Sequence, residues 1–89
     1  MNENEPALRV AAERAEALAA LDEIERGELR ALFLDEVAEA RTHETLRREN
    51  AFIARLAERY GGLTAQRVRG ALWERVAEEK RRRVGNGNE

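Results

Sequence analysis

The stretch RLAERYGGLTAQRVRGALWER, residues 55–75, decides how this chain folds. A run with helical character ends at Gly61 and Gly62, because glycine readily takes the left-handed conformation that follows the last turn of a helix. Thr64 then suits the N-cap of a second helix. The apolar residues of that helix share one face, at the spacing of an α-helix: Val68, Ala71, Leu72 and Val76. The stretch predicts two helices joined by a glycine corner.

Upstream of this corner the chain also has helical periodicity. Apolar residues recur at helical spacing over residues 7–26, and Gly27 is a kink, a break or a tolerated glycine. Residues 28–40 carry a clear apolar stripe, made of Leu29, Leu32, Phe33, Val37 and Ala40. The polar segment 41–45 predicts either a break with Thr42 as cap or a long helix that twists its contact face.

These runs predict an all-α chain with three or four helices, since β-branched residues are few and no alternating runs occur. We expect an extended antiparallel or coiled-coil-like bundle. Residues 1–89 form one helical domain in this reading, with flexible ends at residues 1–5 and 84–89.

The apolar residues suggest a thin core, because 16 of them are Ala. A small chain with little core often gains stability by association, so we expect a homo-oligomer, most simply a dimer built on the long helices. The candidate partner interface is Leu29, Leu32, Phe33, Val37 and Trp73. Trp73 lies at the edge of the buried face, so it either packs against a partner or closes the protomer's own core.

Several site classes find no support in the residues. The chain has no Cys and no Ser, and it lacks a glycine-rich phosphate loop. His43 is four residues from Glu39, and Glu36 could join them in a metal site. A solvated polar face is the favoured explanation, because a metal site would need symmetry-related copies of the chain to complete it. We expect no metal and no cofactor. No apolar run approaches a membrane span and the first residues do not resemble a signal peptide, so we expect a cytoplasmic protein without membrane association.

Charge is divided unevenly along the chain. Residues 1–46 carry a net charge of −7 and residues 47–83 a net charge of +6, within a total of −2. This division suggests two different partners, or one half neutralising the other between protomers. Solvated helix faces with uneven charge are the simpler alternative.

Residues 56–72 resemble the helix-turn-helix of bacterial regulators. The matching positions are Ala57, Gly61, Leu63, Thr64, Val68 and Leu72. The chain departs from that motif at Gly62, which lengthens the turn by one residue. The resemblance implies outward-facing base-contacting and phosphate-contacting residues. These DNA-binding candidates are Gln66, Arg67, Arg69, Arg75, Lys80, Arg81, Arg82 and Arg83. The alternative is a glycine corner between core helices whose arginines are solvated.

Residues 21–76 resemble the all-helical chorismate mutases in the order of their helices. Arg48 and Glu49 match the Arg-Glu pair of that family at the start of its second helix. The resemblance implies a dicarboxylate site lined by Arg and Lys. Two of the family's Arg positions fall at Leu18 and Glu36 here, and residues 41–47 contain no Lys. A site without these cations leaves substrate carboxylates unpaired, which is costly.

Three functions follow from these observations. The leading expectation is a small non-enzymatic DNA-binding protein, whose basic C-terminal half contacts DNA and whose acidic N-terminal half associates. The alternative is a protein–protein adaptor or assembly factor made of docking helices, and the third is a chorismate mutase-like enzyme. DNA binding predicts that the arginines gather on one face. The adaptor predicts an exposed apolar strip, and the enzyme predicts a polar pocket holding Arg48 and Glu49.

Overall fold

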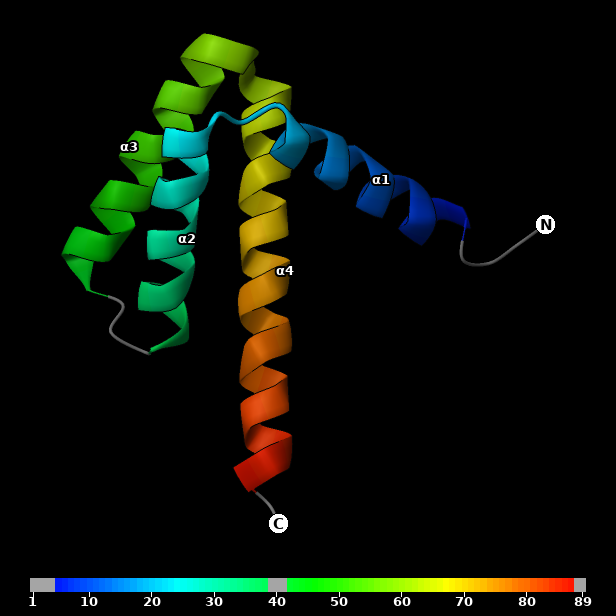
Figure 1. Ribbon diagram of the computed structural model, residues 1–89, viewed down its shortest axis with the longest axis vertical. Helices are drawn as coiled ribbons and strands as arrows, with labels where there is room; N and C mark the ends of the chain where they lie inside the picture. The colour runs from blue at the N-terminus through cyan, green and yellow to red at the C-terminus, as the bar shows by residue number, and fades with distance from the viewer. Residues whose placement is uncertain (1–4, 39–41, 88–89) are drawn as a thin grey trace.

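The computed structural model describes residues 5–38 and 42–87, with side chains up to Val84 (Figure 1). These residues form four helices: α1 (Glu5–Ala19), α2 (Glu23–Val37), α3 (His43–Tyr60) and α4 (Gly62–Gly87). The described ranges contain no strand, and the expected all-α fold is confirmed. Within these ranges no helix combines the length and apolar character that a membrane crossing requires.

Helix α4 is the central element. The other three helices each pack against it, and α2 also packs against α3. Figure 1 shows α2 and α3 side by side in antiparallel directions on one side of α4, while α1 leads away on the other side. The molecule measures 45 × 44 × 21 Å along its principal axes. It is therefore a thin, open arrangement rather than a closed bundle.

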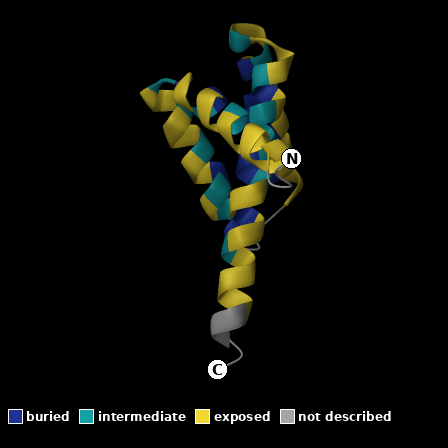
Figure 2. Ribbon diagram, turned by 90° about the vertical axis from the view of Figure 1, so that its right-hand side faces the viewer, coloured by how far each residue is buried: buried dark blue, intermediate teal, exposed yellow. Residues whose placement is uncertain are grey.

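The core lies where α3 and α2 meet α4. Phe52, Ile53 and Leu56 of α3 are buried. The predicted apolar face of α4 is buried as well, with Val68 at 0% and Leu72 at 2% exposure. Figure 2 shows the buried residues on the inward sides of the helices and the exposed residues along the free end of α4. Helices α2, α3 and α4 thus each bury one stripe, whereas α1 buries Ala17 alone among its described residues.

The first helix ends earlier than the sequence predicts. Helix α1 stops at Ala19 instead of continuing to residue 26. Asp22 begins a new helix, because its carboxylate accepts the backbone N–H of Glu25 at 2.8 Å while the Glu25 carboxylate accepts the backbone N–H of Asp22 at 2.8 Å. This capping box satisfies two amide donors that have no partner inside the helix. Gly27, one of the positions considered for a break, lies inside α2.

A second break separates α2 from α3. Ala38 forms the C-cap of α2, and the Thr42 hydroxyl accepts the backbone N–H of Thr45 at 3.3 Å to cap α3. Of the two sequence predictions for this region, the break with Thr42 as cap is confirmed. Residues 39–41 lie outside the described residues. They include Ala40 of the expected apolar stripe and Glu39 of the considered metal site.

The glycine corner has a different cap from the predicted one. Gly61 has φ of 97°, a conformation that side-chain-bearing residues rarely adopt, and its N–H donates to the Ala57 carbonyl at 2.9 Å. Its own carbonyl accepts the N–H of Ala65 at 3.2 Å, so α4 begins directly at Gly62. Thr64 therefore lies in the first turn of α4 and is not its N-cap. At the other end, α4 continues to Gly87, where the sequence suggests a flexible end from residue 84.

Candidate functional site

The arginines of the suspected recognition helix face its neighbouring helices. Arg67 lies 3.5 Å from the Glu13 carboxylate of α1, and Arg69 lies 3.3 Å from the Glu49 carboxylate of α3. The two guanidinium groups therefore contact different helices, which pack on different sides of α4. Gln66 is exposed. The structure does not bring these three side chains onto one free face.

The remaining basic candidates lie further along α4. Arg75 stacks over the Phe33 ring of α2, with 5.2 Å from its guanidinium carbon to the ring centre. Arg82 and Arg83 both pair with Glu79 one turn earlier, and Arg83 also donates to the Val37 carbonyl at 3.3 Å. Two further basic candidates are exposed and make no ion pair within the described residues: Lys80 and Arg81.

Arg48 and Glu49, the pair shared with the chorismate mutases, point in different directions. Arg48 pairs with Asp35 at 2.8 Å on the surface. The Glu49 side chain is 3% exposed and its Oε2 accepts the indole N–H of Trp73 at 3.4 Å, in addition to its contact with Arg69. The carboxylate is thus enclosed by its own neighbours. Arg48 lines a pocket between α2 and α3, whereas Glu49 does not line that pocket.

The acidic and histidine residues considered for a metal site are dispersed. Glu36 is buried at the end of α2, whereas His43 is exposed at the start of α3. Glu39 falls outside the described residues. Across residues 5–38 and 42–87 there is no group of three or more possible metal ligands.

The predicted partner interface divides into two parts. Leu32 and Val37 are buried in the core of the chain itself, at 2% and 3% exposure, so they present no surface to another molecule. Leu29 and Phe33 are half-buried and pack against the edge of the core. Trp73 is also half-buried, and its indole faces Glu49 of α3.

Leu29 and Phe33 form part of a groove where α1, α2 and α4 meet. The groove has a volume of about 450 Å³. Leu18 of α1 is one of its lining residues. Its other lining residues come from α2 and α4: Arg26, Leu29, Arg30, Phe33, Leu34, Ala71, Leu72 and Arg75. Leu34 is 53% exposed although it is a large apolar residue. The groove therefore has an apolar floor with three arginines around it.

These three arginines differ from most others in the chain, because they make no ion pair within the described residues. Arg26 donates to the Ala19 carbonyl at 3.3 Å, and Arg75 stacks on the Phe33 ring. Within residues 5–38 and 42–84, Arg30 makes neither a side-chain hydrogen bond nor a contact with an aromatic ring. By contrast, nine other arginines each pair with a carboxylate: Arg9, Arg14, Arg48, Arg55, Arg59, Arg67, Arg69, Arg82 and Arg83. Positive charge is therefore left uncompensated beside the groove.

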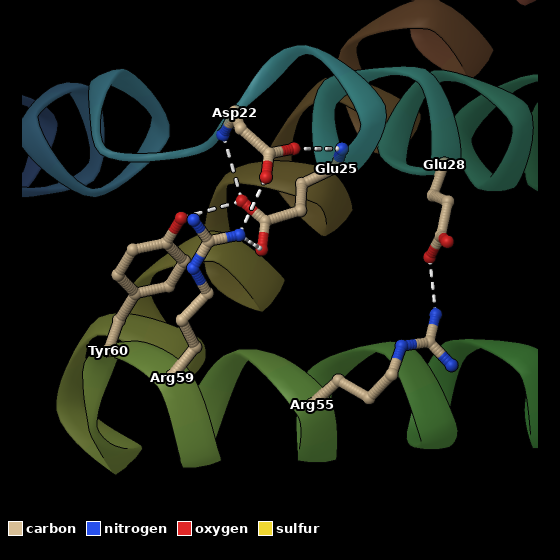
Figure 3. Close-up of polar contacts among 6 residues, drawn as sticks. All are labelled: Asp22, Glu25, Glu28, Arg55, Arg59 and Tyr60. Carbon is tan, nitrogen blue, oxygen red and sulfur yellow. Dashed lines mark hydrogen bonds and ion pairs between the residues drawn. The ribbon is translucent and has the colours of Figure 1, made fainter.

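The α2 wall of the groove is held in place by polar contacts to α3 (Figure 3). Arg59 reaches the carboxylates of Asp22 and Glu25 at 2.6 and 3.1 Å, and the Tyr60 hydroxyl donates to Glu25 at 2.6 Å. One turn further along α2, Glu28 pairs with Arg55. These contacts fix the start of α2 relative to the end of α3.

The same contacts shift the pKa values of the groups involved. The backbone N–H of Glu25 and then the Arg59 guanidinium lower the pKa of Asp22. Desolvation acts to raise the pKa of Glu25, but the Tyr60 hydroxyl, the Asp22 N–H and Arg59 outweigh it, so the pKa is lowered. The hydrogen bond to Glu25 and desolvation raise the pKa of Tyr60. Both carboxylates are therefore stabilised in their charged form.

Helix α1 is attached to α4 over a short length. Arg14 pairs with Glu74 and lies over Gly70, where an added Cβ would meet its guanidinium at 3.0 Å. Ala17 is the buried residue of α1, and Leu18 packs at the margin of the core. The attachment thus lies in the second half of α1, next to the groove.

Arg26 and Arg30 were not among the residues singled out from the sequence. Their signal is weak, because they lie one helical turn apart beside the Leu29 and Phe33 stripe, a pattern that also fits an ordinary solvated edge. Their significance depends on which helix crosses nearby and whether it brings a carboxylate. Comparison with known proteins finds no family model, no curated protein and no solved structure that matches this chain.

Proposed function

We propose that this chain is a non-enzymatic docking protein, whose groove binds an amphipathic helix that carries acidic side chains. The observation that supports this most is the combination of an apolar floor with Arg26, Arg30 and Arg75, which lack carboxylate partners in the described residues. Helix-in-groove recognition requires an apolar channel that receives side chains one turn apart. Arginines at the rim then select for carboxylates and speed association.

The groove has dimensions that suit this occupant. About 450 Å³ accommodates a few apolar side chains, within the range typical of binding pockets. Phe33 and Leu34 offer the apolar contact area of α2, and Leu72 forms the floor on α4. We expect the leucine-type side chains of the ligand helix to fill the channel and its carboxylates to pair with the arginines.

Fluorescence anisotropy with a designed peptide tests this proposal. The probe is a labelled amphipathic helix with two Leu residues one turn apart and Glu on both flanks, and the matched peptide carries Lys instead of Glu. We expect the Glu peptide to bind with a dissociation constant on the order of 10 µM and the Lys peptide to bind at least about tenfold more weakly.

Two variants of the chain locate the binding. Arg30→Glu should raise the dissociation constant of the Glu peptide by about tenfold or more. Arg47→Glu is the matched control, because Arg47 is an exposed arginine of α3 that does not line the groove and makes no ion pair within the described residues. Absence of binding at 1 mM peptide, or equal loss in both variants, overturns the proposal.

A second candidate function is electrostatic DNA binding by the C-terminal part of α4. The supporting observation is that Lys80 and Arg81 are exposed and make no ion pair within the described residues. Neutralising residues 80–83 should weaken binding to all duplex sequences alike and flatten the salt dependence, because such contacts release counterions without reading bases. No binding of the wild-type chain to mixed duplex at about 50 mM salt rules this function out.

A further inference from the structure

Three of the residues that line the groove form a single row along α2. Arg26, Arg30 and Leu34 follow one another at intervals of four residues, so they lie one turn apart on the same side of the helix. All three are exposed. At a rise of about 1.5 Å per residue the row is about 12 Å long. The α2 edge of the groove therefore presents two positive charges one turn apart, followed by one apolar side chain.

The groove has a second, more deeply placed set of lining residues. Leu29 and Phe33 lie one turn apart on α2 and pack against the core, and Ala71 and Leu72 of α4 line the same groove. Figure 1 shows α2 and α4 running in the same direction, and the two helices pack against each other. A helix that fills the channel between two such neighbours lies roughly along both of them. Successive turns of a bound helix then meet successive turns of α2.

Both arginines of the row keep N–H donors for a ligand. Arg26 uses Nη2 for the Ala19 carbonyl, and a guanidinium has several further donors. Arg30 makes no ion pair and no side-chain hydrogen bond within residues 5–38 and 42–84. Arg75 differs from these two, because it comes from α4 and its guanidinium stacks over the Phe33 ring. The pair of charges with a defined one-turn spacing is therefore Arg26 and Arg30.

We propose that the groove selects a partner helix with two acidic residues one turn apart on the flank that faces α2, and a large apolar residue one turn beyond them. This rests on the proposed function, because it specifies which acidic helix the groove binds. In the complex, the two carboxylates pair with Arg26 and Arg30, and the apolar residue packs against Leu34. Arg75 adds positive charge from α4 without selecting the spacing.

Acidic residues two turns apart fit this row less well. A carboxylate paired with Arg26 then places the second carboxylate beside Leu34. A carboxylate paired with Arg30 places the second one beside Asp22, which is itself acidic, or beside Ala38 at the end of α2. The row thus satisfies both carboxylates of a partner only when they are one turn apart.

Fluorescence anisotropy with two helical peptides of identical composition tests this spacing. Both keep the two Leu residues that fill the channel, and they differ in one flank, where the Glu-Glu-Leu peptide and the Glu-Leu-Glu peptide carry these residues at successive turns. We expect the wild-type chain to bind the Glu-Glu-Leu peptide at least about threefold more tightly, because this peptide forms one more solvent-exposed ion pair.

Four variants of the full chain assign the preference to the row. Arg30→Gln weakens the Glu-Glu-Leu peptide by about threefold and leaves the Glu-Leu-Glu peptide unchanged, because only the first places a carboxylate at Arg30. Arg26→Gln weakens both peptides alike, and glutamine keeps an N–H for the Ala19 carbonyl. The preference persists in Arg75→Gln and in the matched control Arg47→Gln, an exposed arginine of α3 that does not line the groove. Circular dichroism confirms that each variant remains helical.

The outcomes separate this inference from the function on which it rests. Equal binding of the two peptides to the wild-type chain, or an Arg30→Gln variant that weakens both alike, overturns the spacing rule and leaves the docking function standing. Either result would mean that the arginines act as a diffuse positive charge. No binding of either peptide at about 1 mM removes the docking function and the spacing rule together.

Discussion

Gly61 is the residue on which the corner between α3 and α4 depends. Its φ of 97° and ψ of 155° lie in a region that is essentially restricted to glycine. Gly27, in contrast, has helical neighbours on both sides, and an added Cβ there would meet nothing within 4 Å. The two glycines therefore have different roles, and of the three alternatives that the sequence allows for Gly27, the structure contains the tolerated glycine.

We predict opposite effects of alanine at these two positions. Gly61→Ala should lower the free energy of unfolding by about 1–3 kcal/mol, because alanine is strained in that conformation. Gly27→Ala should raise the free energy of unfolding by about 0.5–1 kcal/mol, because alanine is the better helix former. Urea denaturation of both variants measures this difference. A Gly61→Ala variant as stable as the wild type would contradict the geometry of the corner.

At the scale of single elements, the start of α2 depends on charged groups. Asp22 and Glu25 cap the helix and bind Arg59 of α3. Their pKa values lie below the ordinary values of 3.8 and 4.5 in the folded chain. Because each pKa is lowered by folding, the associated stability is fully present above the ordinary values and is lost as the pH falls through the lowered pKa values.

This predicts a specific pH dependence. Between about pH 6 and pH 3 the wild-type chain should lose more unfolding free energy than the Asp22→Asn/Glu25→Gln double variant, whose amides do not titrate in this range. Asparagine also remains a good N-cap, so the double variant keeps part of the helix start. Thermal unfolding followed by circular dichroism at several pH values provides the comparison. Parallel pH profiles for the two chains would show that these carboxylates do not act as described.

The helix boundaries show what sequence periodicity can and cannot predict. The polar segment that interrupts the apolar stripe allows either a break with Thr42 as cap or a continuous helix that twists, and the structure contains the break. The break before Asp22 was missed because helical spacing continues through it, and the deciding signal is the Asp22–Glu25 capping box. Leu29, Phe33 and Arg75 were predicted as members of separate sites. They meet in one groove because α2 crosses α4 there, and a single sequence does not specify where helices cross.

At the scale of the whole molecule, α4 holds the other three helices together, and stability should depend on the few large residues packed against it. We predict that Leu56→Ala lowers the free energy of unfolding by about 2–5 kcal/mol, because Leu56 is 1% exposed. Leu63→Ala, at an exposed position, should change the free energy of unfolding by no more than about 0.5 kcal/mol. Chemical denaturation provides both values. Equal effects of the two substitutions would be inconsistent with the core described above.

The location of binding tests the docking function most directly. In a ¹⁵N-labelled sample of the wild-type chain, the designed Glu peptide should shift the backbone resonances of residues lining the groove. These are Leu18, Arg30, Phe33, Ala71 and Arg75. The resonances of Arg47 and its neighbours on α3 should stay in place. Shifts confined to the exposed side of α3, or no shifts at saturating peptide, would contradict the assignment of the groove as the binding site.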